Sequence, residues 1–192
     1  MVFQKDFDDT ISRFEKLEKR GSFYPMFLNL IEKGFRVEAF LFILSTWNFA
    51  SFRYAMKEFD VNDFKNTIKQ LDPHFNKFRN KDFKKINLDD YKKDIIYIFN
   101  ILSKIKGIQA TGSSKLIHLT VPSVFVMWDG YIRKHYNFKN GNAEDYFNFL
   151  KKIQKEFSNT KFLNKDRTFA KAIDQYNYVK ITLPQLESKK RK

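Results

Sequence analysis

Apolar residues recur three and four positions apart along almost the whole chain, which is the spacing of one face of an α-helix. The segment 36–58 is apolar nearly all round and predicts a buried central helix. A composition typical of strands is confined to 124–127, which is short and follows Pro122. The chain is therefore predicted to be all-α, with helices over 7–19, 24–32, 36–58, 60–71, 88–104, 113–120, 130–136, 143–157 and 167–180.

The length of 192 residues is enough for one domain with a real core. The expected architecture is a compact bundle of two closely packed lobes over residues 1–185, divided near 80–87, with a helix-hairpin-helix near 99–120. Residues 186–192 form a basic tail that we expect to be flexible. Phe occurs 23 times, and most of these rings must lie in the core because so many exposed ones would cause aggregation.

The composition excludes several classes of function. Because the chain has no Cys, it forms no disulfide framework and no iron–sulfur cluster, and it uses no Cys nucleophile. Its three His residues are scattered, which disfavours a His-rich zinc site, and we expect no bound metal of that kind. No apolar run approaches the roughly 18 residues of a membrane span, and the N-terminus lacks a signal-peptide core. We therefore expect a soluble, cytoplasmic protein.

Positive charge is concentrated in the second half of the chain. The formal net charge is +14, and residues 101–192 carry 18 basic and 7 acidic side chains, against 18 and 15 in residues 1–100. Such asymmetry is typical of proteins that bind a polyanion, and nucleic acid is the expected partner. The alternative is a Lys-rich surface of the kind found in proteins from AT-rich genomes or hot environments.

The segment 99–136 carries the most information. It begins as a helix, breaks at Gly107, turns through residues 107–112 and becomes helical again from Ser113. Two helices joined by a tight, glycine-containing turn form a helix-hairpin-helix, whose second helix directs backbone N–H groups that can bind phosphate. The expected nucleic-acid contacts are Gly107, Gln109, Thr111, Gly112, Ser113, Ser114, Lys115, Arg133 and Lys134.

The same segment resembles the hairpin-to-aspartate signature of the helix-hairpin-helix DNA glycosylase superfamily. Gly107-Ile108-Gln109 takes the Gly-hydrophobic-Gly place, Ser113 matches a small residue, and Asp129 falls on the catalytic Asp, followed by a hydrophobic and a basic residue. The resemblance implies a DNA glycosylase-like protein of DNA repair, which hydrolyses an N-glycosidic bond. The carboxylate would stabilise the oxocarbenium ion and orient or deprotonate the attacking water. The resemblance implies double-stranded DNA as partner and no cofactor beyond a monovalent cation held by hairpin carbonyls.

The sequence Ser-Lys-Leu-Ile-His from Ser114, followed by Trp-Asp at 128–129, is also similar to a less characterised branch of this superfamily. That branch carries an upstream Trp like Trp47 and a late Ile-Asp pair like Ile173-Asp174. Two departures from the superfamily pattern matter. Gln109 replaces the second hairpin glycine, and Thr111, which cannot form a Schiff base, replaces the catalytic Lys.

Several of these residues have a structural interpretation beside the functional one. Asp129 can be the N-cap of the next helix instead of the catalytic carboxylate. Lys115 can be a displaced nucleophile, a phosphate contact or a surface Lys. Trp47, Trp128 and Tyr131 can form a pocket for a flipped base, or the Trp rings can belong to the core. His118 is expected to be a satisfied structural imidazole.

Three functions therefore remain open. The first is a monofunctional glycosylase that uses Asp129, with Lys115 as a second catalytic candidate. The second is a nucleic-acid-binding module of the same fold that has lost the chemistry. The third is an unrelated helical interaction or defence protein.

Overall fold

The computed structural model describes residues 1–17, 23–164 and 167–190 of the chain. Within these ranges it contains helices and no strand, which confirms the predicted fold class. The helices are α1 (Gln4–Leu17), α2 (Phe23–Glu32), α3 (Arg36–Trp47), α4 (Phe49–Ala55), α5 (Val61–Asn76), η2 (Leu88–Tyr91), α6 (Lys92–Ser103), α7 (Gln109–Thr120), α8 (Gly130–His135), α9 (Ala143–Glu156), α10 (Phe169–Asn177), the π-helical turn η3 (Tyr178–Thr182) and α11 (Leu183–Lys190).

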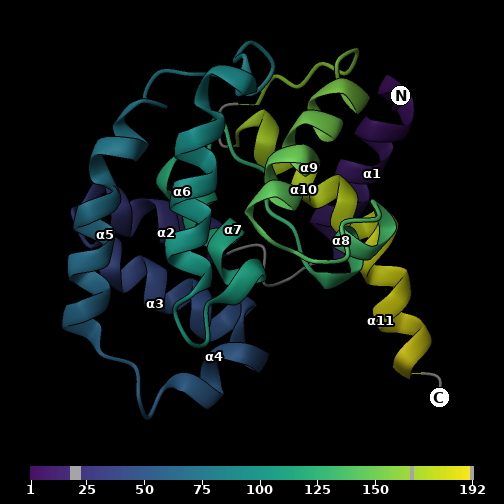
Figure 1. Ribbon diagram of the computed structural model, residues 1–192. Coiled ribbons are helices and arrows are strands. Elements are labelled where there is room, and N and C mark those ends of the chain that lie inside the picture. Colours follow the sequence, from purple (N-terminus) through teal and green to yellow (C-terminus); the bar gives the residue numbers. More distant parts are fainter. Residues whose placement is uncertain (18–22, 165–166, 191–192) are drawn as a thin grey trace.

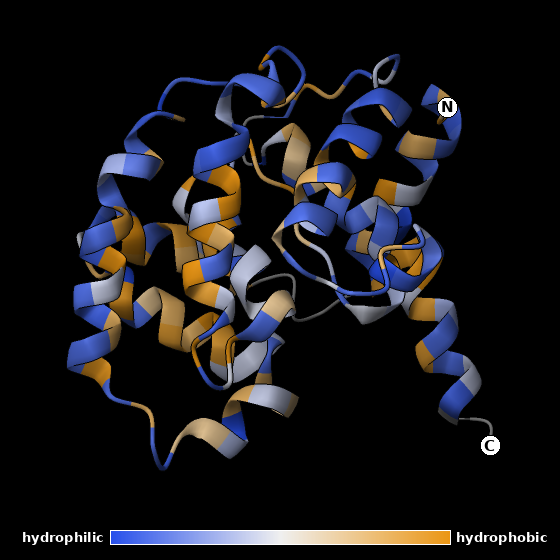
Figure 2. Ribbon diagram, in the orientation of Figure 1, coloured by the Kyte–Doolittle hydropathy of each residue, from blue (hydrophilic) through white to orange (hydrophobic). Residues whose placement is uncertain are grey.

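Helix α6 is the central element of the bundle. It buries Ile95, Ile98, Phe99 and Leu102, which lie on one face at positions i, i+3, i+4 and i+7. It packs against α7 and α9, while α2 and α3 also pack on α7. Figure 1 shows α2, α3 and α5 on one side of α6, and α1 with α8 to α11 on the other. In Figure 2 the apolar residues concentrate on inner helices such as α3 and α6.

Helix α1 joins the C-terminal part of the fold. It packs against α10 and η3, and its buried residues are Phe7, Thr10, Ile11 and Phe14. A division of the chain near 80–87 would therefore separate α1 from the helices that cover its apolar face.

The prediction of a single central helix over 36–58 is wrong, because this segment forms two helices, α3 and α4, that meet at Asn48. The Asn48 backbone carbonyl accepts from the N–H groups of Ser51 and Phe52 and so starts α4 anew. The predicted end of the helix 60–71 is also wrong, since α5 continues through Pro73 to Asn76. Pro73 is exposed and removes only one backbone donor, while buried Leu71 and Phe75 anchor the helix on both sides of it.

The strand-like residues 124–127 form a buried, non-helical connection from α7 to α8. At the other end of the chain, the expected flexible tail 186–192 is helical in α11 as far as Lys190, and residues 191–192 lie outside the described part. None of the described helices combines the length and the apolar character needed to cross a lipid bilayer.

Candidate functional site

The hairpin between α6 and α7 has the backbone of a tight turn with two left-handed residues. Gly107 has φ +87° and Gln109 has φ +51°. The position where the superfamily pattern places its second glycine thus requires positive φ, and Gln109 adopts it despite its side chain. The replacement of glycine by Gln109 therefore leaves the turn intact.

Helix α4 and the preceding residue, Asn48, contact the hairpin directly. A Cβ on Gly107 would lie 2.5 Å from Cβ of Ala55, so only glycine allows this approach of the two backbones. The buried Asn48 side chain donates through Nδ2 to the carbonyls of Gly107 (2.9 Å) and Ile108 (3.3 Å). A monovalent cation at these two carbonyls would have to compete with the Asn48 amide.

The N-terminus of α7 leaves two backbone donors without a carbonyl. Its N-cap residue, Ile108, provides no side-chain cap. The N–H groups of Ile108 and Gln109 donate to Ile105 O, and Gly112 N–H donates to Ile108 O. Within the described ranges, the N–H groups of Ala110 and Thr111 donate to no carbonyl or side chain. These two half-buried residues are therefore the part of the hairpin that can receive an anion.

Four of the expected nucleic-acid contacts, Gly107, Gly112, Ser113 and Ser114, are buried inside the protein. Ser113 Oγ donates to Gln109 O at 2.6 Å, and Ser114 Oγ donates to Thr111 O at 2.9 Å. Gly112 packs closely on the side chains of Asn48 and Leu44. The side chains of Ser113 and Ser114 are therefore not available to phosphate, because their hydroxyls bond the backbone in the core.

Asp129 lies half-buried at the start of α8. Its Oδ1 accepts from the N–H groups of Tyr131 and Ile132, both at 2.8 Å, and so caps the helix. Its Oδ2 accepts from the hydroxyl of Thr182 in η3 at 2.7 Å. The capping interpretation is thus realised in the structure, and neither carboxylate oxygen lacks a donor.

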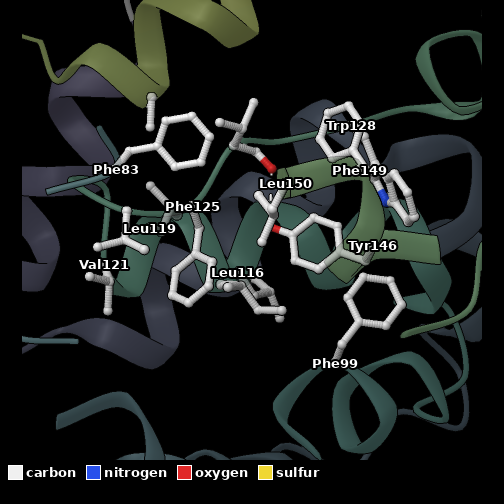
Figure 3. Packing of buried hydrophobic residues seen from close by; sticks show 14 of the residues in the cluster. Phe83, Phe99, Leu116, Leu119, Val121, Phe125, Trp128, Tyr146, Phe149 and Leu150 are labelled. Carbon is white, nitrogen blue, oxygen red and sulfur yellow. Dashed lines mark hydrogen bonds between the residues drawn. The ribbon is translucent and has the colours of Figure 1, made fainter. Parts of the chain in front are cut away.

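Trp128 belongs to the core rather than to an open base pocket. It is 1% exposed, and its Nε1 donates to Ala110 O at 3.0 Å. Figure 3 shows its ring among Phe99, Tyr146 and Phe149, with the Tyr146 ring 5.0 Å away. Aromatic packing on this scale leaves no free ring face for a base.

The other two aromatic candidates are half-buried and lie elsewhere. The Lys189 Nζ of α11 lies 5.3 Å from the centre of the Tyr131 ring. Trp47 ends α3 and packs edge-to-face against Phe27. Among the described residues, Trp47 has ring contacts with Tyr24 and Phe27, and Trp128 has ring contacts with Phe99, Phe138, Tyr146 and Phe149, so no ring contact joins two of the three candidates.

The candidate cations have different surroundings. Lys115 Nζ donates to the carbonyl of Trp47 at the C-terminal end of α3. A positive charge is stabilised there, because this end of the helix dipole is negative. The Arg133 guanidinium lies 5.6 Å from the Trp128 ring centre, and its Nε is buried without a partner among the described residues. Lys134 is exposed. Of the three, Lys134 is the most open to a polyanion.

A buried charged cluster that the sequence analysis did not identify lies beside Trp47. Lys171 is 2% exposed, and its Nζ lies 2.5 Å from Oδ2 of Asp174, whose side chain is 16% exposed. The Lys171 ammonium is 4.8 Å from the ring centres of both Tyr24 and Trp47. These two rings are parallel and 6.4 Å apart. The cation is thus held by one carboxylate and two aromatic faces.

His118 continues this cluster and is the satisfied imidazole that the sequence predicts. Its Nδ1 lies 2.6 Å from the carbonyl of Phe125 and must donate to it, so Nε2 accepts from the Tyr24 hydroxyl at 2.7 Å. Burial, together with the charge of Lys171, lowers the pKa of His118 to about 3. Burial also raises the pKa of Tyr24 above its usual range. Both groups are therefore neutral near pH 7.

The described residues contain no group of three or more His, Asp and Glu side chains arranged to hold a metal ion. The candidate site has three parts, which are the hairpin with its two N–H donors, the helix cap Asp129 and the buried Lys171–Asp174 pair. Comparisons with protein-family models, curated proteins and solved structures give no match to this chain.

Proposed function

We propose that this chain binds nucleic acid, and that the hairpin before α7 receives a phosphate of double-stranded DNA. The observation that carries the proposal is the pair of backbone N–H groups at Ala110 and Thr111, which donate to no group in the described protein. Donors of this kind at the start of a 12-residue helix favour an anion, because the helix dipole adds to the hydrogen bonds. They recognise the backbone and not the base sequence.

The charge distribution supports this proposal. The second half of the chain carries 11 more basic than acidic residues. Lys104 precedes the hairpin and Lys134 lies on α8, and both side chains are exposed. A phosphate at Thr111 would therefore lie in a region of positive potential, where binding weakens as salt increases.

Replacing Thr111 with glutamate tests the proposed phosphate site. A carboxylate there suits the helix N-terminus but repels phosphate, so we expect affinity for a 20-bp duplex to fall about tenfold. The same charge change at the exposed Ser12 of α1 is the control, and we expect it to alter affinity less than about twofold. Fluorescence anisotropy over a salt series measures both. Equal losses in the two variants, or binding that ignores salt, would contradict the proposal.

A second candidate function is base excision by hydrolysis of an N-glycosidic bond, with Asp129 as the carboxylate. The observation in its favour is that α7 fixes the residue before Asp129. Ser114 Oγ accepts from Trp128 N–H at 3.2 Å, and Ala110 O accepts from the Trp128 ring. Asp129 therefore lies beside the hairpin, and an ionised carboxylate there could stabilise an oxocarbenium ion.

Duplexes that carry uracil, hypoxanthine, oxidised guanine, alkylated adenine or mismatches test this second candidate, with alkali to reveal abasic sites. In Asp129→Asn the amide oxygen can still cap α8, so we expect base release to fall at least about 100-fold while duplex binding stays within about twofold. Thr182→Val removes only the donor to Oδ2 and is the matched control. Equal loss of cleavage and binding in Asp129→Asn would make Asp129 purely structural. Strand cleavage without alkali would instead direct attention to Lys115.

A further inference from the structure

Helix α4 carries an unusual number of exposed aromatic and apolar side chains for seven residues. Phe49 is 51% exposed, Tyr54 is 71% exposed, and Met56, directly after the helix, is 57% exposed. The Arg53 guanidinium lies 4.5 Å from the centre of the Tyr54 ring and 5.6 Å from that of Phe49. We call Phe49, Arg53, Tyr54 and Met56 the α4 patch. Large apolar side chains that gather on a surface in this way mark a binding site.

The α4 patch is rigidly connected to the proposed phosphate site. The opposite face of α4 buries Phe52 and Ala55, and Ala55 touches the hairpin at Gly107. Asn48, the residue before α4, bonds the hairpin carbonyls. Figure 1 shows α4 at the lower edge of the molecule, next to the turn between α6 and α7. The rings of the α4 patch and the two N–H donors of α7 therefore keep a fixed relative position.

The charges near the α4 patch favour a polyanion over an apolar partner. Arg53, Lys57 and Lys104 are exposed, and none of them forms an ion pair with a described carboxylate. Glu58 forms an ion pair with Lys106 of the hairpin. The exposed Asp60 and Asp63 line a hollow with Glu58 and Lys106, so three cations without an ion pair stand against two such carboxylates here. Aromatic rings and a guanidinium plane among free cations are the combination on which unpaired bases stack, because every base offers a π-face.

We infer that the α4 patch stacks an unpaired base of the nucleic acid whose phosphate lies on the hairpin. The inference rests on the proposed function, and it names the substrate class as a strand with an unpaired or gapped segment beside a duplex. Phe49 and Tyr54 supply the ring faces, and Arg53 supplies both a planar face and a charge. The hairpin would hold the duplex end through its backbone, while the α4 patch would select for the unpaired nucleotide.

The double variant Phe49→Ala/Tyr54→Ala tests the inference with two probes, a 20-bp duplex and the same duplex with a three-nucleotide single-stranded gap. We expect wild type to prefer the gapped probe, and the double variant to lose affinity for it by about tenfold or more while keeping duplex affinity within about twofold. Phe35→Ala is the matched control, because Phe35 is also 51% exposed but precedes α3. We expect Phe35→Ala to bind both probes as wild type does.

The outcomes separate the inference from the proposed function. Wild type that binds duplex in a salt-sensitive way but does not prefer the gap would overturn the inference alone. An equal loss on both probes in the double variant would do the same, since the α4 patch would then serve general binding or folding. Binding of neither probe by wild type would overturn both. If wild type instead binds anionic lipid vesicles more tightly than either duplex probe, and the double variant does not, the α4 patch is a membrane-binding surface. That result would also overturn the inference.

Discussion

Replacing Gly107 with alanine is expected to lower the free energy of unfolding by about 2–5 kcal/mol. Two effects add. The new side chain is strained at φ +87°, and its Cβ would lie 2.5 Å from Cβ of Ala55 and 3.4 Å from Cα of Phe52. Relief requires α4 to move away from the hairpin, which would also stretch the bonds from Asn48. Urea denaturation followed by circular dichroism measures the loss.

Gly34→Ala is the control that separates these two effects. Gly34 has the same φ of +87°, but a Cβ there would meet nothing within 4 Å. We expect it to cost only the backbone strain, about 1–2 kcal/mol. If the two variants lose the same stability, then the contact between α4 and the hairpin contributes nothing. Because this contact also places the α4 patch, Gly107→Ala should weaken binding of a gapped duplex in preparations that remain folded.

Most of the helices could be predicted because each buries a regular stripe. The spacing of Ile95, Ile98, Phe99 and Leu102 is sufficient to identify α6. The break at Asn48 could not be predicted in this way, because apolar residues continue through it. What breaks the helix is a long-range interaction, since the Asn48 amide bonds carbonyls 59 and 60 residues later in the chain. Periodicity reports the face of a helix and not the tertiary bonds of one polar residue.

The hairpin and Asp129 could be located from the sequence, but their surroundings could not. The sequence predicts two roles for Asp129, a helix cap and a catalytic carboxylate, and the structure shows the helix cap. Thr182 donates to the second carboxylate oxygen from the π-helical turn 53 residues later, and no local sequence pattern predicts this contact. The sequence predicts that Ser113 and Ser114 contact phosphate because they directly follow the turn. They are buried instead, because Gly112 brings this side of α7 against α3.

Lys171 was missed because a Lys on a helix is usually solvated. The available signal was its setting, with Ala170, Ala172 and Ile173 beside it and Asp174 three positions later. An ammonium flanked by apolar residues, with a carboxylate one helical turn away, is typical of a buried ion pair. The aromatic faces of Tyr24 and Trp47 that complete the cluster come from α2 and α3, and only the fold reveals them.

Asp174→Asn is expected to lower the free energy of unfolding by about 3 kcal/mol. The substitution leaves the ammonium of Lys171 buried without its counter-charge, and removal of one partner of a buried pair typically costs about 3–5 kcal/mol. We expect the lower end of that range, because the asparagine oxygen can still accept from Nζ and the two rings still face the cation. Urea denaturation at pH 7 measures the effect.

Two further variants identify the cause of the stability loss in Asp174→Asn. Glu58→Gln breaks the exposed pair with Lys106, and we expect a loss of at most about 1 kcal/mol because solvent screens that pair. Lys171→Met in the Asp174→Asn background removes the uncompensated charge, so the double variant should be more stable than Asp174→Asn alone. If the double variant is instead the less stable, the aromatic faces of Tyr24 and Trp47 hold Lys171 without needing Asp174. The carboxylate, which is the more exposed member of the pair, would then be free for a role other than stability.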